Sequence, residues 1–281
     1  MFKAPLLERI ARECYSDPGE LYATLKARGM DLITVTDHDS IDGSEPLRRY
    51  PDFFLSEEVT CIMPGGAQIH TGVYGITEKQ HIEIQRRRDD LVSLLIYLTE
   101  HQILFSINHV ISSLTGRRDA EDFRWFHSYF PAYETRNGQM TPRQNALAAQ
   151  LAAAQGKAPI AGSDAHTLAS AGTTFTEIPG ARDAQEFLSG LRAGQGIARG
   201  EHGSYFKLTR DVFLIIAGMM REIRWTTALA PFATLVPFVT LTHMASEVAF
   251  ARRWNARLSN SPEARNRPLW ELEMAAEEVL S

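Results

Sequence analysis

Short apolar segments alternate with helix-like segments from residue 16 to about residue 200, and this alternation is the strongest constraint on the fold. The first helix-like segment shows the pattern, because Asp17 and Pro18 form a start signal and Gly29 follows its last residue, Arg28. Proline at the first helical position and glycine after the last one are typical helix boundaries. Alternating βα units predict a mostly parallel sheet covered by helices.

The predicted elements recur with short connections. We expect strands at residues 32–35, 103–107, 132–135 and 160–163, and helices at residues 79–101, 119–129, 145–155 and 183–192. An open doubly wound sheet would collect functional residues at one switch point between two strands, whereas a barrel gathers them from several strand ends. Because at least four predicted strand ends carry candidate ligands, we favour a βα barrel in residues 1–210, followed by a helical extension in residues 211–281.

The composition excludes several classes of protein. With 281 residues, of which 44% are hydrophobic and 22% charged, the chain can bury a large core. Its formal net charge of -5 argues against a binder of double-stranded nucleic acid, which needs a basic face to neutralise phosphates. The two cysteines, Cys14 and Cys61, have no paired spacing, and no secretory signal is visible. We expect a cytoplasmic protein without a disulfide framework.

Residue types that bind metal ions follow several of the predicted strands. In chain order they are Asp37, His38, Glu58, His70, His109, Asp164 and His166. Carboxylate oxygens bridge hard divalent ions, and imidazole nitrogens hold borderline ions such as zinc, manganese or iron. Taken singly, each residue has an ordinary interpretation, such as a capped turn or a hydrogen-bonded polar side chain. Their recurrence at four strand ends favours one polynuclear metal site.

Two adjacent carboxylates need a separate argument. Glu57 and Glu58 lie in one extended segment, and side chains alternate across a strand, so only one of them can face the interior. The alternative is a pair of exposed edge carboxylates. His81 and His101 lie on a predicted helix, and we expect them to take less part in the site.

Six motifs together resemble the PHP (polymerase and histidinol phosphatase) family. They are Val-Thr-Asp-His-Asp-Ser-Ile-Asp-Gly (35–43), Ser-Glu-Glu-Val-Thr (56–60), Ile-His (69–70), Asn-His (108–109), Glu-Thr-Arg-Asn-Gly (134–138) and Gly-Ser-Asp-Ala-His (162–166). The resemblance covers roughly residues 14 to 208 and is closest to stand-alone bacterial PHP proteins. It implies a distorted seven-stranded βα barrel that hydrolyses phosphate esters with two or three divalent ions (Mn, Zn, Fe or Mg).

The resemblance also implies a role for each ligand. Glu58 would bridge two ions, with His70 and His109 completing the shell of one of them. Asp164 would serve the first ion, and the third ion would be held by His38 and His166.

Other positions of the family pattern point to catalysis and to the substrate. Asp37 would act beside His38 as a carboxylate partner, and both are predicted with Asp164 to be catalytic. Arg136 and Asn137 are predicted to contact substrate, Arg136 through its forked donors to phosphate. Glu134 matches a position near the site, but we do not expect it to be a ligand.

One part of the family pattern is missing. Members open with a strand that carries Asp-x-His-x-His, and nothing before Asp37 matches it. We therefore expect a barrel without its first strand, in which the shell of Glu58, His70 and His109 is intact. Two explanations stay open: a start codon assigned too far downstream, which we favour, or a true truncation with altered function.

The last seventy residues lose the βα rhythm. Two apolar stretches occur, at 211–220 and 225–246, and the second contains no formal charge and could span a bilayer by length. Pro231, Pro237 and several threonines dilute it. A helical hairpin packed on the barrel is the first interpretation, and membrane association through residues 211–250 is the alternative.

Together these features predict a metal-dependent phosphoesterase that acts on a phosphorylated small molecule or nucleotide. The alternative is a catalytically impaired PHP remnant that binds metal as an accessory protein in glycan synthesis. A metal-dependent amidohydrolase on a similar barrel fits the Thr-Asp-His and Ser-Asp-Ala-His spacing less well.

Overall fold

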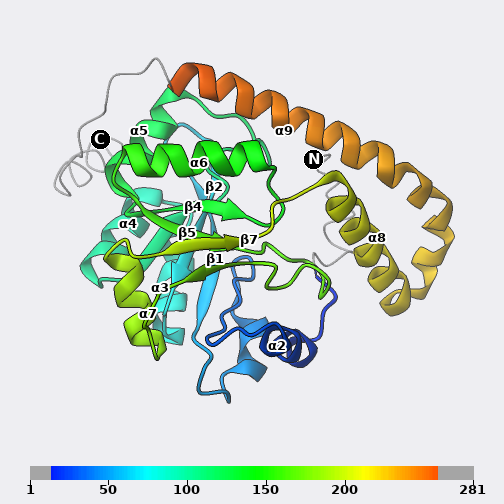
Figure 1. Cartoon of the computed structure of the whole chain (residues 1–281), viewed down its shortest axis with the longest axis horizontal. Helices are drawn as coiled ribbons and strands as arrows, with labels where there is room; N and C mark the ends of the chain where they lie inside the picture. Colours follow the sequence, from blue (N-terminus) through cyan, green and yellow to red (C-terminus); the bar gives the residue numbers. More distant parts are fainter. Residues whose placement is uncertain (1–13, 259–281) are drawn as a thin grey trace.

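The computed structural model describes residues 14–258, and Figure 1 shows their arrangement. The strands are β1 (Ser56–Ile62), β2 (Gln68–Tyr74), β3 (Leu104–Ile107), β4 (Ala132–Asn137), β5 (Ala158–Gly162), β6 (Thr174–Glu177) and β7 (Ile197–Gly200). The α-helices are α2 (Pro18–Ala27), α3 (Glu78–Arg87), α4 (Leu91–Glu100), α5 (Ala120–Tyr129), α6 (Pro142–Ala154), α7 (Ala184–Arg192), α8 (Tyr205–Glu222) and α9 (Val236–Leu258). Two segments, η1 (Asp42–Leu47) and η2 (Arg224–Leu235), are 3₁₀ helices.

The strands form a mixed α/β fold. Strands β1 to β5 make one sheet in sequence order, and β6 and β7 make an antiparallel ribbon. β3, β4 and β5 are parallel, as the βα alternation predicts, but β1 and β3 both run antiparallel to β2. The connection at residues 63–67 is too short for a crossover, so β1 and β2 can only form a hairpin. The ribbon lies beside β5. There the Thr176 hydroxyl accepts a hydrogen bond from the Ala161 N–H and donates one to the Ala161 carbonyl.

The expected strand at residues 32–35 forms only isolated bridges. Ile33 makes one bridge, and His38 makes a parallel bridge with Glu58 of β1. The Glu58 N–H also donates to the carbonyl of Asp37 at 3.1 Å. The candidate ligand His38 is therefore held beside β1 although no full strand precedes it.

Capping side chains explain where the helices begin. Asp17 caps α2 by accepting hydrogen bonds from two backbone N–H groups of the first turn, as the sequence predicts. The single helix expected at residues 79–101 is instead two helices. Asp90 ends the continuity, because its side chain accepts from the N–H groups of Val92 and Ser93 and starts α4 there.

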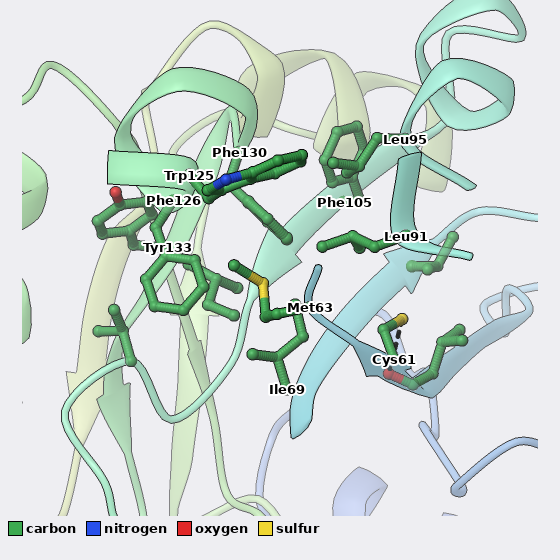
Figure 2. Packing of buried hydrophobic residues seen from close by; sticks show 14 of the residues in the cluster. Cys61, Met63, Ile69, Leu91, Leu95, Phe105, Trp125, Phe126, Phe130 and Tyr133 are labelled. Atoms are coloured by element: carbon green, nitrogen blue, oxygen red, sulfur yellow. Dashed lines mark hydrogen bonds between the residues drawn. The ribbon is translucent and has the colours of Figure 1, made fainter. Parts of the chain in front are cut away.

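The main core lies between the sheet and helices α4 and α5. Figure 2 shows its aromatic part, in which the ring of Phe105 from β3 lies 5.6 Å from that of Phe130, and Phe126 lies 5.8 Å from Phe130. Helix α9 contributes to the same core, since the rings of Trp254 and Phe123 are 4.5 Å apart. The C-terminal helix thus packs against the α/β part of the chain.

A buried carboxylate docks helix α8. Asp211 is 2% exposed and accepts hydrogen bonds from Thr167 Oγ1 (3.2 Å), Gln139 Nε2 (3.0 Å) and Ser170 Oγ. These donors lie on the loops that follow β4 and β5. The predicted domain division after residue 210 falls inside α8, next to this contact.

A second buried carboxylate docks helix α9. Glu247 is 3% exposed and accepts from the Ser113 N–H (3.1 Å) and from Gln144 Nε2 (2.5 Å). In Figure 1 helix α9 runs along α6, to which Gln144 belongs. Both helices are therefore attached to loops at the carboxyl ends of the parallel strands.

Candidate metal centre

His38, Glu58 and His70 form a compact group of candidate ligands. Their ligand atoms all lie within 4.8 Å of one another. β1 supplies Glu58, β2 supplies His70, and the bridge to β1 supplies His38. His70 Nδ1 lies 3.2 Å and His38 Nε2 lies 3.8 Å from the Glu58 carboxylate, which is almost fully buried. The structure thus brings together three of the predicted ligands.

His109 joins this group from the end of β3. Its Nε2 lies 3.0 Å from Glu58 Oε1, and its Nδ1 lies 2.9 Å from Glu134 Oε2. The backbone N–H of His109 donates to the same Glu134 oxygen at 2.9 Å. A carboxylate on Nδ1 fixes the imidazole so that Nε2 can bind an ion. The sequence places Glu134 near the site, and the structure gives it the task of orienting His109.

A bulge in β4 directs two of its side chains to the site. Residues three apart on a regular strand point to opposite faces. The register with β5 shifts between Glu134 and Arg136, and a shift of this kind re-aims the following side chains. Asn137 Nδ2 therefore reaches both Glu134 Oε1 (2.9 Å) and Asp164 Oδ2 (3.1 Å). In this position Asn137 joins the end of β4 to the end of β5.

Three residues of the site have a left-handed backbone. Their φ angles are 55° at Asp39, 48° at His109 and 47° at Asp164, and in residues 14–258 only Gln102 is a further non-glycine residue of this kind. Asp and His tolerate this conformation better than most residues, but it remains unfavourable. Each of the three comes at or just after a strand or bridge, where the turn aims its side chain. Such clustering of strained residues is typical of functional sites.

Three other predicted site residues lie at the margin of the group. His166 Nδ1 is 3.2 Å from the Asp164 carbonyl and 4.0 Å from the Asp164 carboxylate, so the structure keeps this Asp-x-His pair together. The carboxylate of Asp37 packs against Gly43, where a Cβ atom would clash with it. Arg136 donates to the carbonyl of Gly200 in β7 at 2.7 Å.

Glu57 lies on the opposite face of β1 from Glu58. Its Oε2 accepts hydrogen bonds from Gln85 Nε2 and contacts His81 Nδ1, both at 2.8 Å. Glu57 is fully buried, and burial raises the pKa of its carboxyl group. The expectation that only one of the two carboxylates faces the candidate ligands is confirmed, but neither is an exposed edge carboxylate.

Charge balance sets the protonation of the site. Burial raises the pKa of Glu58, but the charge of His109 and its hydrogen bond to Glu58 outweigh burial and hold that pKa well below its ordinary value. Burial lowers the pKa of His109, but the charges of Glu134 and Glu58 outweigh it and raise that pKa well above its ordinary value. Without an ion, the raised pKa of His109 favours its protonated form.

The donor set fits a divalent ion. His70 Nδ1 is buried and has no hydrogen-bond partner among the described residues, although it lies 3.2 Å from a Glu58 oxygen. An imidazole nitrogen and a carboxylate oxygen this close to each other can share a divalent cation. Imidazole and carboxylate donors together suit zinc, manganese or iron. His38, Glu58, His70 and His109 would hold the ion, with Asp164 beside them.

Ion binding is expected to displace the proton of His109. A raised pKa means that His109 is protonated at neutral pH, so its Nε2 must lose the proton before it can bind. Affinity for Mn²⁺ should rise with pH up to the pKa of His109. Calorimetry near neutral pH, in two buffers of different ionisation enthalpy, should show about one proton released for each ion bound. Glu134→Gln should reduce this release, and a buffer-independent enthalpy in the unaltered chain would contradict the assignment.

The same pKa has the opposite consequence for the metal-free fold. Because the pKa of His109 is raised, its contribution to stability is fully present below the ordinary histidine value of about 6.5 and is lost as the pH rises through the raised value.

Comparison with solved structures shows a shared fold. PsfC from Pseudomonas syringae superposes with a TM-score of 0.53 at 14% sequence identity, covering 76% of this chain and 96% of that one. An amidohydrolase from Chromobacterium violaceum, solved with bound sulfate and no metal, superposes with a TM-score of 0.50 at 14% identity, covering 66% of this chain and 93% of that one. No curated protein matches the sequence.

A family model gives the more specific match. The model is described as PHP-associated, and it matches residues 142–195. This range runs from α6 through β5 to α7 and includes Asp164 and His166. Outside it, His38, Glu58, His70 and His109 converge in space in the order of the PHP motifs. The chain is therefore similar to PHP-associated proteins over residues 142–195.

Proposed function

We propose that the chain is a metal-dependent phosphoesterase that cleaves phosphomonoesters or nucleotide-like phosphate esters. The observation that supports this most is the convergence of three histidines on the buried carboxylate of Glu58 from separate elements. We assign the strands to a distorted βα barrel of PHP type in residues 1–210. Two or three divalent ions (Mn, Zn, Fe or Mg) would complete the centre.

Each residue has a task that follows from its position. Glu58 offers one oxygen to His70 and His109 and the other to His38, so its carboxylate can bridge two ions. Glu134 keeps His109 in place, as argued above. When bound, the ions would act as Lewis acids toward substrate phosphate and lower the pKa of a water.

Substrate contact would come from the rim of the centre. Asp164 lies next to Asn137, and its strained backbone holds the carboxylate at the end of β5. Arg136 would have to exchange its bond to the Gly200 carbonyl for a phosphate oxygen, which its forked guanidinium can bind more strongly. Asp37 and His38 lie beside β1. The site can thus hold a phosphate group between the ends of β1 and β5.

Manganese-dependent phosphate release by the full chain tests the proposal. The panel should contain p-nitrophenyl phosphate, bis-p-nitrophenyl phosphate, sugar phosphates and nucleoside monophosphates. We expect release with Mn²⁺, loss with a chelator, and a drop of about 100-fold in Asp164→Asn. Asparagine is chosen because it tolerates the left-handed backbone at this position.

The controls separate three outcomes. Arg136→Ala should raise KM while metal content stays unchanged, since its role is to bind substrate. Metal bound at full occupancy with no phosphate released from any ester would favour the accessory-protein alternative. Release that continues unchanged in Asp164→Asn would contradict the assigned centre.

A further inference from the structure

Exposed apolar side chains are concentrated on the C-terminal helices. Eleven large hydrophobic residues are exposed in the described part of the chain, and nine of them lie between residues 206 and 241. The most exposed are Phe206 (81%), Phe238 (68%), Phe232 (65%), Val239 (58%) and Trp225 (57%). Soluble proteins rarely gather so much exposed apolar surface, and a patch of this kind marks an interaction site.

The patch is not the inner face of a core helix. Residues 224–258 are long and apolar enough to cross a membrane by length and composition, yet only 11% of their most apolar window is buried. The side of α9 that faces the protein is occupied by Val236, Thr240, Glu247 and Trp254. Phe238, Val239 and Leu241 lie on its other side. Figure 1 shows η2, in yellow, at the edge of the molecule away from the sheets.

Charge distinguishes this region from the rest of the chain. Residues 205–258 contain seven Lys or Arg and three Asp or Glu, whereas the whole chain carries a net charge of -5. Two of those three acidic residues, Asp211 and Glu247, are buried in contacts with the α/β part. Arg221 and Arg224 precede the uncharged stretch 225–246. An apolar patch bordered by arginines complements an anionic lipid surface.

The docking contacts favour a helix that lies in the plane of the surface. Glu247 is bonded to Ser113 and Gln144, and Trp254 is packed in the main core, so the second half of α9 cannot leave the protein without breaking both. Tryptophan is typical of the membrane interface, and Trp225 lies next to Arg224.

We propose that the face formed by the exposed side chains of η2 and the first half of α9 binds the surface of an anionic lipid bilayer. Trp225, Phe232 and Phe238 enter the interface between headgroups and acyl chains. Arg221 and Arg224 contact the lipid phosphates. The candidate metal centre stays outside the bilayer, because α8 and α9 are attached to the loops around it.

Vesicle sedimentation with the full chain tests this proposal. We expect the chain to sediment with vesicles of phosphatidylcholine and phosphatidylglycerol, and more weakly with phosphatidylcholine alone. The combined variant Trp225→Ala, Phe232→Ala, Phe238→Ala should bind these vesicles at least about tenfold more weakly. Arg221→Ala and Arg224→Ala should each reduce binding to the anionic vesicles by about fivefold.

A matched control comes from another exposed apolar residue. Ile82→Ala on α3 removes a side chain that is 49% exposed but lies outside the patch, and it should leave vesicle binding unchanged. No sedimentation of the unaltered chain with either vesicle would overturn the proposal. So would retention of the chain in vesicles after an alkaline carbonate wash, which a spanning helix survives. Light scattering that shows a dimer, lost in the combined variant, would assign the face to a second copy instead.

Discussion

Glu58→Gln is expected to abolish metal binding and hydrolysis while leaving the fold intact. Glutamine has the shape of glutamate but lacks the negative charge with which Glu58 would attract a cation to the group of His38, His70 and His109. The loss of a partner that merely orients a ligand lowers affinity by about 10-fold to 100-fold, so the loss of a bridging ligand should exceed 100-fold. Mn²⁺ content after dialysis and phosphate release are the two measurements.

Glu57→Gln is the matched control for this variant. Glu57 occupies the same strand, is equally buried and also pairs with a histidine, but it faces α3. Its substitution should change the melting temperature and leave the Mn²⁺ content close to that of the unaltered chain. Equal metal content in the two variants would contradict the assignment of Glu58 as the central ligand.

Asp211→Ala should have the largest effect on stability. The carboxylate receives hydrogen bonds from three buried or half-buried side chains, and alanine would leave their donors without a partner. Hydrogen bonds to a charged group are each worth about 1.5–3 kcal/mol, and an unpaired buried donor adds its own cost. We expect a loss of about 4 kcal/mol in the free energy of unfolding, measured by urea denaturation.

The same substitution should also loosen the metal centre. Thr167 and Ser170 lie a few residues after Asp164, and Gln139 lies two residues after Asn137, so α8 restrains both loops through Asp211. Amide exchange should therefore accelerate in residues 163–173 and 138–141. Glu177→Ala, which removes an exposed pair with Arg199, should change neither exchange nor stability by more than about 0.5 kcal/mol. Amide exchange that stays unchanged in both loops of Asp211→Ala would contradict the proposal that Asp211 restrains them.

Lowering the pH should reproduce part of the loss of stability that is expected for Asp211→Ala. Burial raises the pKa of Asp211, but the hydrogen bonds from Ser170, Gln139 and Arg210 outweigh it and lower that pKa. A lowered pKa means that the contribution to stability is present above the ordinary aspartate value of about 3.9 and is lost as the pH falls through the folded value. Asp211→Asn should therefore flatten the dependence of stability on pH in the acid range.

Local chemistry allowed much of the fold to be predicted from the sequence. Asp17 at the start of α2 and the βα order of residues 103–192 follow from capping and periodicity. Alternation along β1 showed that one carboxylate of Glu57 and Glu58 must face the site. The sequence pattern of residues 79–101 is helical throughout and predicts one helix. In the structure the Asp90 side chain caps a new helix, α4, and so divides this segment in two.

The rest depended on contacts between elements distant in the sequence. Residues 32–35 have the composition of a strand, but only one isolated bridge, from Ile33 to Phe53, forms there. Glu134 could not be assigned its task, because the bulge that places it and Asn137 on one side is set by pairing with β5. The docking of Asp211 and Glu247 carries no sequence signature, since their partners outside their own helices lie 41 or more positions away.

Anomalous diffraction from crystals grown with Mn²⁺ and measured at the manganese absorption edge would locate the ion that Glu58 and the histidines are proposed to bind. We expect an anomalous peak within bonding distance of the Glu58 carboxylate and of at least two among His38 Nε2, His70 Nδ1 and His109 Nε2. A manganese peak elsewhere, with no anomalous peak beside Glu58 in the same crystals, would contradict the assignment of Glu58 as a metal ligand.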